Sequence, residues 1–453
     1  MNEENKMGTM PVGKLLVTMS LPMMASMMVQ ALYNIVDSIF VSRICEDALT
    51  AVSLAFPIQT VMIGLATGLG VGMNAVLSRA LGSKDYKKVT SAAMNSLFMT
   101  LVNIAIMVIV GIFAVKPFYL SQTTDPTIVG YGVDYLSIVC IVSPGLFFQI
   151  IFEKMLQSTG RTLESMYSQL TGAIINIIFD PILIFGLFGF PEMGVKGAAI
   201  ATVMGQICGA IFAFFLNLRR NKEIEFSFKG FRPDSRMIAE IYKVGLPTII
   251  MQCVGSVMTY AMNRILIVFS STATAVFGVY YKLQSIIFMP LFGLNSGLVP
   301  IVAYNYGAQK RKRMTGVIKW AVGIAIAIMS AGTLMFELIP GPLFKLFDAS
   351  DFMLSMGIPA LRIIGVHFPI AAVCIIFGSV FQALGNGVYS LIVSLIRQIL
   401  VLLPAAYLLS LLGNVNYVWW AFPIAEIASL IVSTICMIRI NKNVIAQVPL
   451  GTD

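Results

Sequence analysis

Two aspartates stand inside long apolar runs of this chain. Asp37 lies within ALYNIVDSIFV, and Asp180 ends the segment NIIFD, four residues after Asn176. In a helix, residues four apart share one face. If these runs cross a membrane, each acid costs roughly 3 kcal/mol to place there, so both are candidate functional residues.

Two carboxyl groups and an amide in an apolar setting can bind a small cation. A carboxyl group away from water holds a proton more readily, and carboxylate and amide oxygens suit a hard metal ion. We therefore predict a proton or sodium site at Asp37, Asn176 and Asp180. The alternative is that each acid pairs with a basic residue for structure, but no Lys or Arg lies at this depth in the first six runs.

The composition is that of a membrane protein. Of the 453 residues 58% are hydrophobic and only 11% are charged, whereas a soluble domain has roughly 25% charged residues. Apolar runs long enough to span a bilayer as helices lie near 14–41, 48–79, 90–115, 128–153, 163–187, 193–218, 237–269, 274–303, 314–340, 352–382, 387–411 and 417–439.

The charge pattern predicts the orientation of these spans. With the N-terminus inside the cell, the outer segments hold only four basic residues, and all the other basic residues outside the spans lie in inner segments. An excess of Lys and Arg marks the cytoplasmic side, so we expect both termini in the cytoplasm. The net charge of +9 then reflects membrane orientation, and no nucleic-acid partner is expected. The four outer basic residues are Arg43, Lys116, Lys196 and Lys345.

An internal repeat divides the chain. A shift of 225 residues places Leu21-Pro22 on Leu246-Pro247, and it also superimposes several other landmarks. The further pairs are Gln59 and Gln284, Gly68 and Gly293, Gly72 and Gly297, Gly82 and Gly307, Pro144 and Pro369, Gln157 and Gln382, and Gly160 and Gly385.

The repeat predicts an all-α polytopic membrane protein with twelve transmembrane helices. Six spans per half insert in the same direction, so the two six-helix lobes should be related by a pseudo-twofold axis along the membrane normal. The predicted domains are an N-lobe at 1–218, a cytoplasmic linker at 219–236 and a C-lobe at 237–453.

The second half lacks the acids of the first. Shifted by 225, the three candidate ion ligands become Met262, Val401 and Ala405. We interpret basic residues near span ends as reaching toward the membrane surface, His367 as a packed core residue, and Arg397 and Glu426 as a structural pair. The ionisable residues in the second-half spans are Arg264, Lys282, Arg362, His367, Arg397 and Glu426.

Sequence motifs argue against an enzyme. The chain has no nucleotide-binding P-loop and no HExxH or GxSxG motif, so we expect neither an ATP-driven pump nor a catalytic site, and no cofactor. On the span of Asp37, Met27 and Met28 could contribute to an adaptable apolar binding surface.

Several motifs resemble those of one transporter family. The segments PVGKLL, ALYNIVDSIFV, GVGMNAVLSRALG, NIIFDPILIFG and GVKGAAIAT are similar to those of the multidrug and toxic compound extrusion (MATE) transporters, in the DinF-like branch. The resemblance covers both halves. It implies an ion site in the N-lobe formed by Asp37, Asn176, Asp180 and Thr202, with Tyr135 and Gln30 contacting ion or substrate. The NorM-like branch has acids in its seventh and tenth spans, which this chain lacks in Gly245–Val268 and Ile358–Phe381.

The resemblance also implies the activity. We expect a monomeric exporter in the bacterial inner membrane, surrounded by lipids, that exchanges amphipathic, mostly cationic compounds for protons or sodium by alternating access. A flippase for a lipid-linked substrate, from the same broad superfamily, is the alternative.

Overall fold

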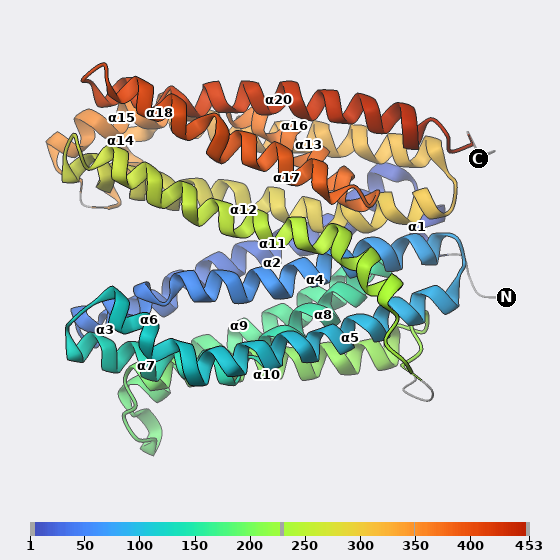
Figure 1. Cartoon of the computed structure of the whole chain (residues 1–453), viewed down its shortest axis with the longest axis horizontal. Helices are drawn as coiled ribbons and strands as arrows, with labels where there is room; N and C mark the ends of the chain where they lie inside the picture. Colours follow the sequence, from blue (N-terminus) through green and yellow to red (C-terminus); the bar gives the residue numbers. More distant parts are fainter. Residues whose placement is uncertain (1–4, 227–230, 348, 450–453) are drawn as a thin grey trace. The chain divides into compact units, whose positions relative to one another are not determined.

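The computed structural model describes residues 5–226, 231–347 and 349–449, and all regular structure in these ranges is helical (Figure 1). The α-helices are α1 (Lys6–Thr9), α2 (Val12–Ser42), α3 (Glu46–Leu54), α4 (Phe56–Gly82), α5 (Tyr86–Ile109), α6 (Val115–Gln122), α7 (Pro126–Ile141), α8 (Pro144–Ser158), α9 (Thr162–Phe185), α10 (Val195–Arg220), α11 (Ser235–Leu266), α12 (Ser271–Gly307), α13 (Arg311–Leu338), α14 (Pro340–Lys345), α15 (Asp351–Gly365), α16 (Phe368–Ala383), α17 (Gly387–Leu395), α18 (Leu402–Ser410), α19 (Val415–Val418) and α20 (Ala421–Ile440). The short π- and 3₁₀-helical segments are η1 (Val110–Ala114), η2 (Leu187–Gly189), η3 (Ile396–Leu400) and η4 (Asn441–Ile445).

Ten helices in the described part of the chain are long and apolar enough to cross a membrane. Two further pairs, α7–α8 and α15–α16, are bent by 45° and 49° and bring the number to twelve if each pair crosses once. The second helix of each pair starts at or next to a proline, Pro144 or Pro369, and these prolines are equivalent in the repeat. Proline suits the first turn of a helix because no intrahelical partner is needed for its nitrogen there. The predicted all-α fold with twelve spans is confirmed.

The helices form two compact units whose boundaries differ from the predicted lobes. The N unit consists of residues 25–249, and the C unit consists of the described residues up to Met24 together with those from Ile250 onward. Thus the first part of α2 belongs to the C unit and the first part of α11 to the N unit. The predicted N-lobe (1–218) and C-lobe (237–453) therefore exchange their first helical segments, and the two exchange points are again 225 residues apart.

Close helix packing and polar contacts hold the chain start in the C unit. Oγ of Ser20 donates to the carbonyl of Leu294 at 3.3 Å. A Cβ atom at Gly297 would lie 3.0 Å from Cα of Ser20, and one at Gly293 would lie 2.4 Å from Cα of Met24. The buried Asn305 of α12 donates to the carbonyl of Met7, which precedes α2 in the chain, at 3.1 Å. The repeated glycines of α12 thus let α2 approach its backbone.

The equivalent glycines of α4 receive the start of α11 in the N unit. A Cβ atom at Gly68 would lie 2.6 Å from the carbonyl oxygen of Gly245, and one at Gly72 would lie 2.2 Å from that of Ile241. Small residues are common where membrane helices touch, because van der Waals contact drives their association in lipid. The repeat of glycines is therefore a repeat of one packing contact.

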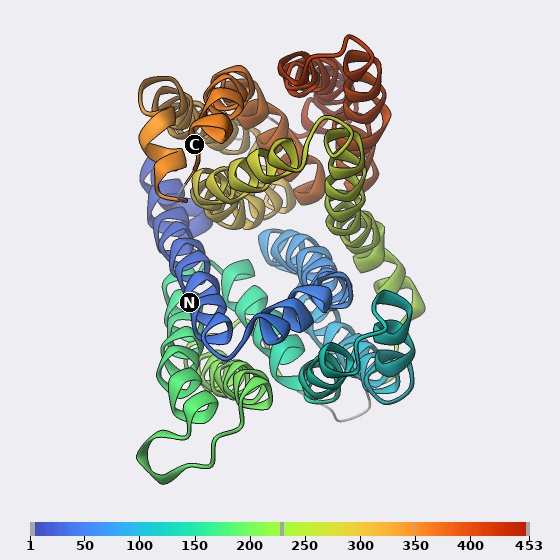
Figure 2. The same cartoon turned by 90° about the vertical axis from the view of Figure 1, so that its left-hand side faces the viewer.

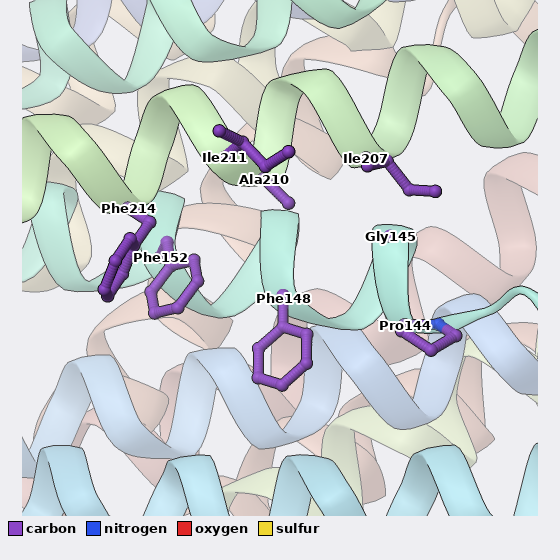
Figure 3. A pocket seen from close by; sticks show the side chains of 8 residues that line it. All are labelled: Pro144, Gly145, Phe148, Phe152, Ile207, Ala210, Ile211 and Phe214. Atoms are coloured by element: carbon purple, nitrogen blue, oxygen red, sulfur yellow. The ribbon is translucent and has the colours of Figure 1, made fainter.

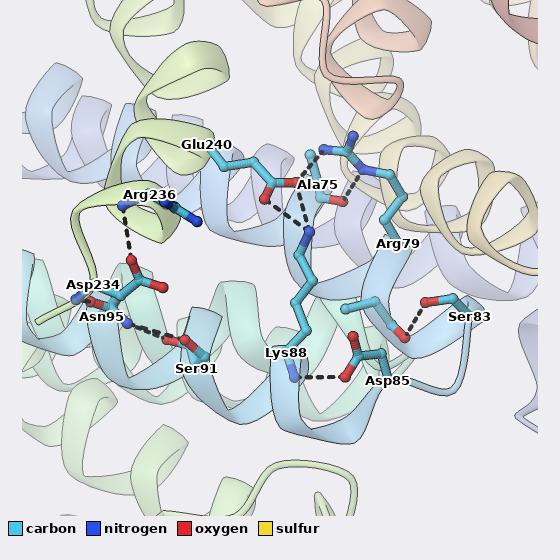
Figure 4. A network of polar contacts seen from close by, with 11 residues as sticks. Ala75, Arg79, Ser83, Asp85, Lys88, Ser91, Asn95, Asp234, Arg236 and Glu240 are labelled. Atoms are coloured by element: carbon cyan, nitrogen blue, oxygen red, sulfur yellow. Dashed lines mark hydrogen bonds and ion pairs between the residues drawn. The ribbon is translucent and has the colours of Figure 1, made fainter. Parts of the chain in front are cut away.

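A polar network fixes the same segment of α11 at one end of the N unit (Figure 4). Nζ of Lys88 lies 2.9 Å from Oε2 of Glu240, and Nη2 of Arg79 lies 3.9 Å from its Oε1. Oδ1 of Asn95 accepts from the backbone nitrogen of Asp234 at 2.8 Å. The predicted linker, 219–236, thus contacts α5 of the N unit through Asp234, and the residues 227–230 of the linker lie outside the described ranges.

Three helices of the N unit, α8, α9 and α10, pack closely together. Between α9 and α10 a Cβ atom at Gly205 would lie 2.5 Å from the carbonyl oxygen of Gly172. The loop that joins α9 to α10, from Gly186 to Gly194, projects away from the helices (Figures 1 and 2). The tight contact brings polar side chains of both helices together.

Substituting Gly72 by alanine should destabilise the N unit, because the new methyl group would meet the backbone of α11 and overpacking costs about 1–3 kcal/mol. We expect Gly72→Ala to lower the thermal unfolding temperature of detergent-purified protein by several degrees. The matched control is Gly278→Ala in α12, where a Cβ atom meets nothing within 4 Å and helix propensity favours alanine. Equal unfolding temperatures for both variants would contradict the packing argument.

Candidate functional site

The two aspartates meet inside the N unit. Asp37 comes from the second half of α2, and Asp180, whose side chain is fully buried, comes from α9. Their carboxyl groups lie within hydrogen-bonding reach of each other. An ionised carboxylate only accepts hydrogen bonds, so this contact is favourable only when a proton or another cation lies between the two groups.

Asn176 links this pair to α10. Its amide satisfies both neighbours when the nitrogen faces Asp180: Nδ2 then donates to Oδ2 of Asp180 at 3.1 Å, and Oδ1 accepts from the backbone nitrogen of Thr202 at 3.1 Å and from its Oγ1 at 3.3 Å. The opposite orientation leaves one bond, from Nδ2 to Oγ1 of Thr202 at 3.3 Å. The hydrogen-bond network thus favours the first orientation.

Two tyrosines lie close enough to the acids for electrostatic interaction. Tyr135 of α7 is 3% exposed, and its hydroxyl accepts from Nε2 of Gln59 of α4 at 3.2 Å. Both Tyr33 and Tyr135 interact electrostatically with Asp37 and Asp180. The site is therefore lined by polar groups from α2, α4, α7, α9 and α10.

No basic group in the described part of the chain compensates the acids. Among the described residues, neither Asp37 nor Asp180 forms an ion pair within 4 Å. Oδ1 of each acid is buried without a hydrogen-bond donor. Buried charge without a partner is costly, so the arrangement suits a bound proton, or a sodium ion surrounded by the oxygens of Asp37, Asp180, Asn176 and Thr202. These contacts give no support to the alternative that each acid pairs with a basic residue for structural reasons.

The predicted metal ligands include only two acids. The described part of the chain has no group of three or more His, Cys, Asp or Glu side chains that could hold a metal ion. A sodium ion at Asp37, Asn176 and Asp180 would depend on the amide oxygen turning toward the carboxylates, in the orientation that has the single bond to Thr202.

The other predicted substrate residues lie along α2 outside this hydrogen-bonded cluster. Oε1 of Gln30 accepts from Nε2 of Gln169 on α9 at 3.1 Å. Met27 is half-buried, and Met28 is exposed. The structure thus brings together Asp37, Asn176, Asp180, Thr202 and Tyr135, whereas Gln30, Met27 and Met28 lie on the same helix as Asp37 without a described contact to the acids.

Sequence reasoning missed two residues of the cluster. Tyr33 precedes Asp37 by four residues, so the spacing rule that grouped Asn176 with Asp180 would have found it. In the sequence, Gln59 stands out only as a landmark of the repeat. Its contact with Tyr135 depends on how α4 and α7 pack, which no local sequence pattern shows.

Several ionisable residues of the C unit have partners of their own. Nη1 of Arg397 lies 4.0 Å from Oε1 of Glu426, which agrees with the predicted pair. His367 is 4% exposed, and its Nδ1 contacts the carbonyl of Ile364. Nζ of Lys282 lies 5.8 Å from the ring centre of Phe347, at a distance that allows a cation–π contact.

A separate apolar groove of about 450 Å³ lies between α8 and α10 (Figure 3). It contains none of the predicted site residues and no charged side chain, so it belongs to the apolar surface of the N unit. The lining residues are Pro144, Gly145, Phe148, Phe152, Ile207, Ala210, Ile211 and Phe214.

Comparisons with known proteins agree with this architecture. The sequence profile of the MatE family matches residues 22–182 and 247–408. The multidrug export protein MepA of Staphylococcus haemolyticus is 28% identical over 91% of this chain and 90% of its own length. An FAD transporter of Shewanella oneidensis is 25% identical over 94% of each chain.

A solved structure shows the same fold. An outward-facing multidrug resistance MATE family transporter of the MOP superfamily superimposes with a TM-score of 0.91 at 26% identity, over 98% of this chain and 99% of that chain. Because the family profile covers well over half of the sequence, and in both halves, the chain belongs to the MATE family of membrane transporters.

Proposed function

We propose that this protein exports amphipathic, mostly cationic compounds in exchange for protons by alternating access. The observation that carries this proposal is the contact between the half-buried Asp37 and the buried Asp180, two carboxyl groups on different helices that have no basic partner among the described residues. The related MepA proteins are multidrug exporters by name.

Exchange follows from competition for the same negative charge. With a proton between them, Asp37 and Asp180 hold α2 against α9. When the proton leaves, two carboxylates at this distance repel each other, and a cationic compound becomes the favourable partner. A proton that returns from outside restores the contact and removes the charge that attracts the compound, which favours its release.

The lining of the site supports an amphipathic substrate. Tyr33 and Tyr135 lie close to the acids, and aromatic rings attract organic cations. Met27 and Met28 lie two to three turns before Asp37 on α2, and methionine side chains adapt to ligands of different shape.

Sodium is the alternative coupling ion. Turning the amide of Asn176 would replace a donor to Asp180 by an acceptor, so that oxygens of Asp37, Asn176, Asp180 and Thr202 surround one cation. Oxygen donors of this kind suit a hard metal ion. The number of hydrogen bonds in the described structure favours the proton-loaded orientation.

The same proposal includes the location. The basic inner segments would place both termini in the cytoplasm of a bacterial cell, with the protein acting as a monomer in the inner membrane among lipids. Neither an enzyme activity nor a cofactor is part of this mechanism.

Ethidium efflux from proteoliposomes tests the proposal. With a pH gradient imposed in the absence of sodium, we expect efflux, because protons reaching Asp37 and Asp180 drive release of the dye. The measurement is ethidium fluorescence over time, compared with empty liposomes. A sodium gradient in place of the pH gradient is the second arm.

The outcomes separate the candidate functions. If efflux requires sodium, the coupling ion at this site is sodium and not a proton. Absence of ethidium efflux under both gradients would contradict drug export, and the same liposomes loaded with FAD or a lipid-linked sugar would then test the substrate classes suggested by the Shewanella relative and by the flippase alternative.

Substitution of Asp180 by asparagine should abolish coupling, because an amide cannot exchange a proton. We expect gradient-driven ethidium efflux to fall at least about tenfold, which corresponds to about 1.4 kcal/mol, with unchanged elution on size-exclusion chromatography. The control is Asp134→Asn on α7, where the aspartate is exposed and lies 3.3 Å from Nζ of Lys196. Normal efflux by Asp180→Asn would exclude the proposed role.

A further inference from the structure

A third acid, Glu153, lies buried in the N unit and has no role in the site described above. It stands on α8 and is 6% exposed. Its Oε1 lies 3.0 Å from Nε2 of Gln149 on the same helix and 3.1 Å from Oγ of Ser168 on α9. Gln149 in turn packs beside Gly172 and Gly209, so Glu153 belongs to the core of the α8–α9–α10 packing.

Within the described ranges, Glu153 has no cation partner. Among the described residues it forms no ion pair within 4 Å, and the one charged group that acts on it is its neighbour Lys154. Nζ of Lys154 is directed elsewhere, to Oε1 of Gln157 at 2.8 Å, and its stem packs on Gly70 of α4. On α9 the carboxyl group of Glu153 contacts Ser168, which in turn contacts the backbone carbonyl of Gly209 on α10. Neither α9 nor α10 therefore presents a titratable side chain to Glu153.

The hydrogen bonds of Ser168 require one more proton than an ionised Glu153 allows. Oγ of Ser168 lies 2.9 Å from the carbonyl oxygen of Gly209 and 3.1 Å from Oε1 of Glu153. A serine hydroxyl has a single hydrogen to donate. With Glu153 ionised, one of the two contacts joins two acceptors without a hydrogen. With a proton on Oε1, Glu153 donates to Ser168, and Ser168 donates to Gly209.

We propose that Glu153 is a second proton-binding site of the transporter, located between the Asp37–Asp180 pair and the inner end of the N unit. This deepens the proposed function, on which its place in transport rests. Ser168 lies twelve residues before Asp180 on α9, about 18 Å along the helix axis. Buried residues on one face of α9 connect the two sites: Ser165, Ser168, Gly172, Asn176 and Asp180.

Position along the helices gives this site its direction. Glu153 lies five residues before the end of α8, about 7.5 Å along the axis, at the end of the span that the charge pattern places in the cytoplasm. A proton leaving the Asp37–Asp180 pair for the cytoplasm would therefore pass close to Glu153. The purely structural alternative is a polar tie between three helices, which a glutamine would form equally well.

Infrared difference spectroscopy separates these alternatives without relying on transport. The carboxylic acid C=O band is recorded on purified protein over a pH series, in the Asp37→Asn/Asp180→Asn double variant and in the triple variant that adds Glu153→Gln. We expect the double variant to keep a carboxylic acid band at neutral pH that the triple variant loses, corresponding to about one proton per protein molecule.

Glu164→Gln is the matched control. Glu164 lies in the first turn of α9, four residues before Ser168, but it is paired with Arg161 at 3.5 Å. Adding it to the double variant should leave the band unchanged. If Glu153→Gln removes only carboxylate bands at every pH at which the protein is folded, the proton site at Glu153 is excluded. The isosteric amide can donate to Ser168 in place of the protonated acid, and an unfolding scan of each variant checks that the fold is intact.

Transport assays then test whether Glu153 takes part in proton movement. In otherwise unsubstituted protein, Glu153→Gln should keep ethidium binding but lower efflux driven by the pH gradient and shift its dependence on internal pH. Efflux with an unchanged pH profile would leave no transport role for Glu153. If the unsubstituted protein shows no ethidium efflux at all, the proposed function fails, while the infrared band still decides whether Glu153 binds a proton.

Discussion

Two carboxyl groups in an apolar interior can stay in contact only while a cation lies between them. In this chain that constraint connects α2 to α9 through Asp37 and Asp180, and no basic side chain in the described structure takes the place of the cation. The strength of this helix contact therefore depends on the ion that is bound. In the proposed exchange mechanism, this dependence is what allows the state of the ion site to change how the helices pack.

The rest of the N unit keeps the acids in place by close backbone packing. In lipid, helices gain little from burying apolar side chains against each other, so close contact has to come from small residues. Gly68 and Gly72 admit the start of α11, and Gly205 brings α10 against α9. The contact at Gly205 places Thr202 of α10 beside Asn176, which lies about one turn before Asp180 on α9. The polar site is thus positioned by glycines that take no part in its chemistry.

Much of this architecture could be predicted from the sequence. The hydropathy pattern predicts the number of spans, and the four-residue spacing of Asn176 and Asp180 predicts that these two residues lie on one face of a helix. The exchange of the first segments of α2 and α11 could not be predicted, because the apolar residues of both helices are spread around the helix axis with little bias to one face, and this pattern does not select a partner. Glu153 was overlooked for a related reason: it lies at the end of an apolar run, where an acid is unremarkable until its neighbours on α9 and α10 are known.

The exchanged helix starts also constrain how the chain can fold during synthesis. The N unit includes residues up to Ile249, so its packing surface on α4 stays open until the ribosome has made the beginning of the second half. The C unit, in contrast, takes its first helical segment from a part of the chain that precedes the N unit, so this segment has already been made when the second half is synthesised. Neither half is therefore a self-sufficient folding module, although the two descend from one repeated pattern. A gene encoding only the first six spans would leave the glycine surface of α4 exposed to lipid.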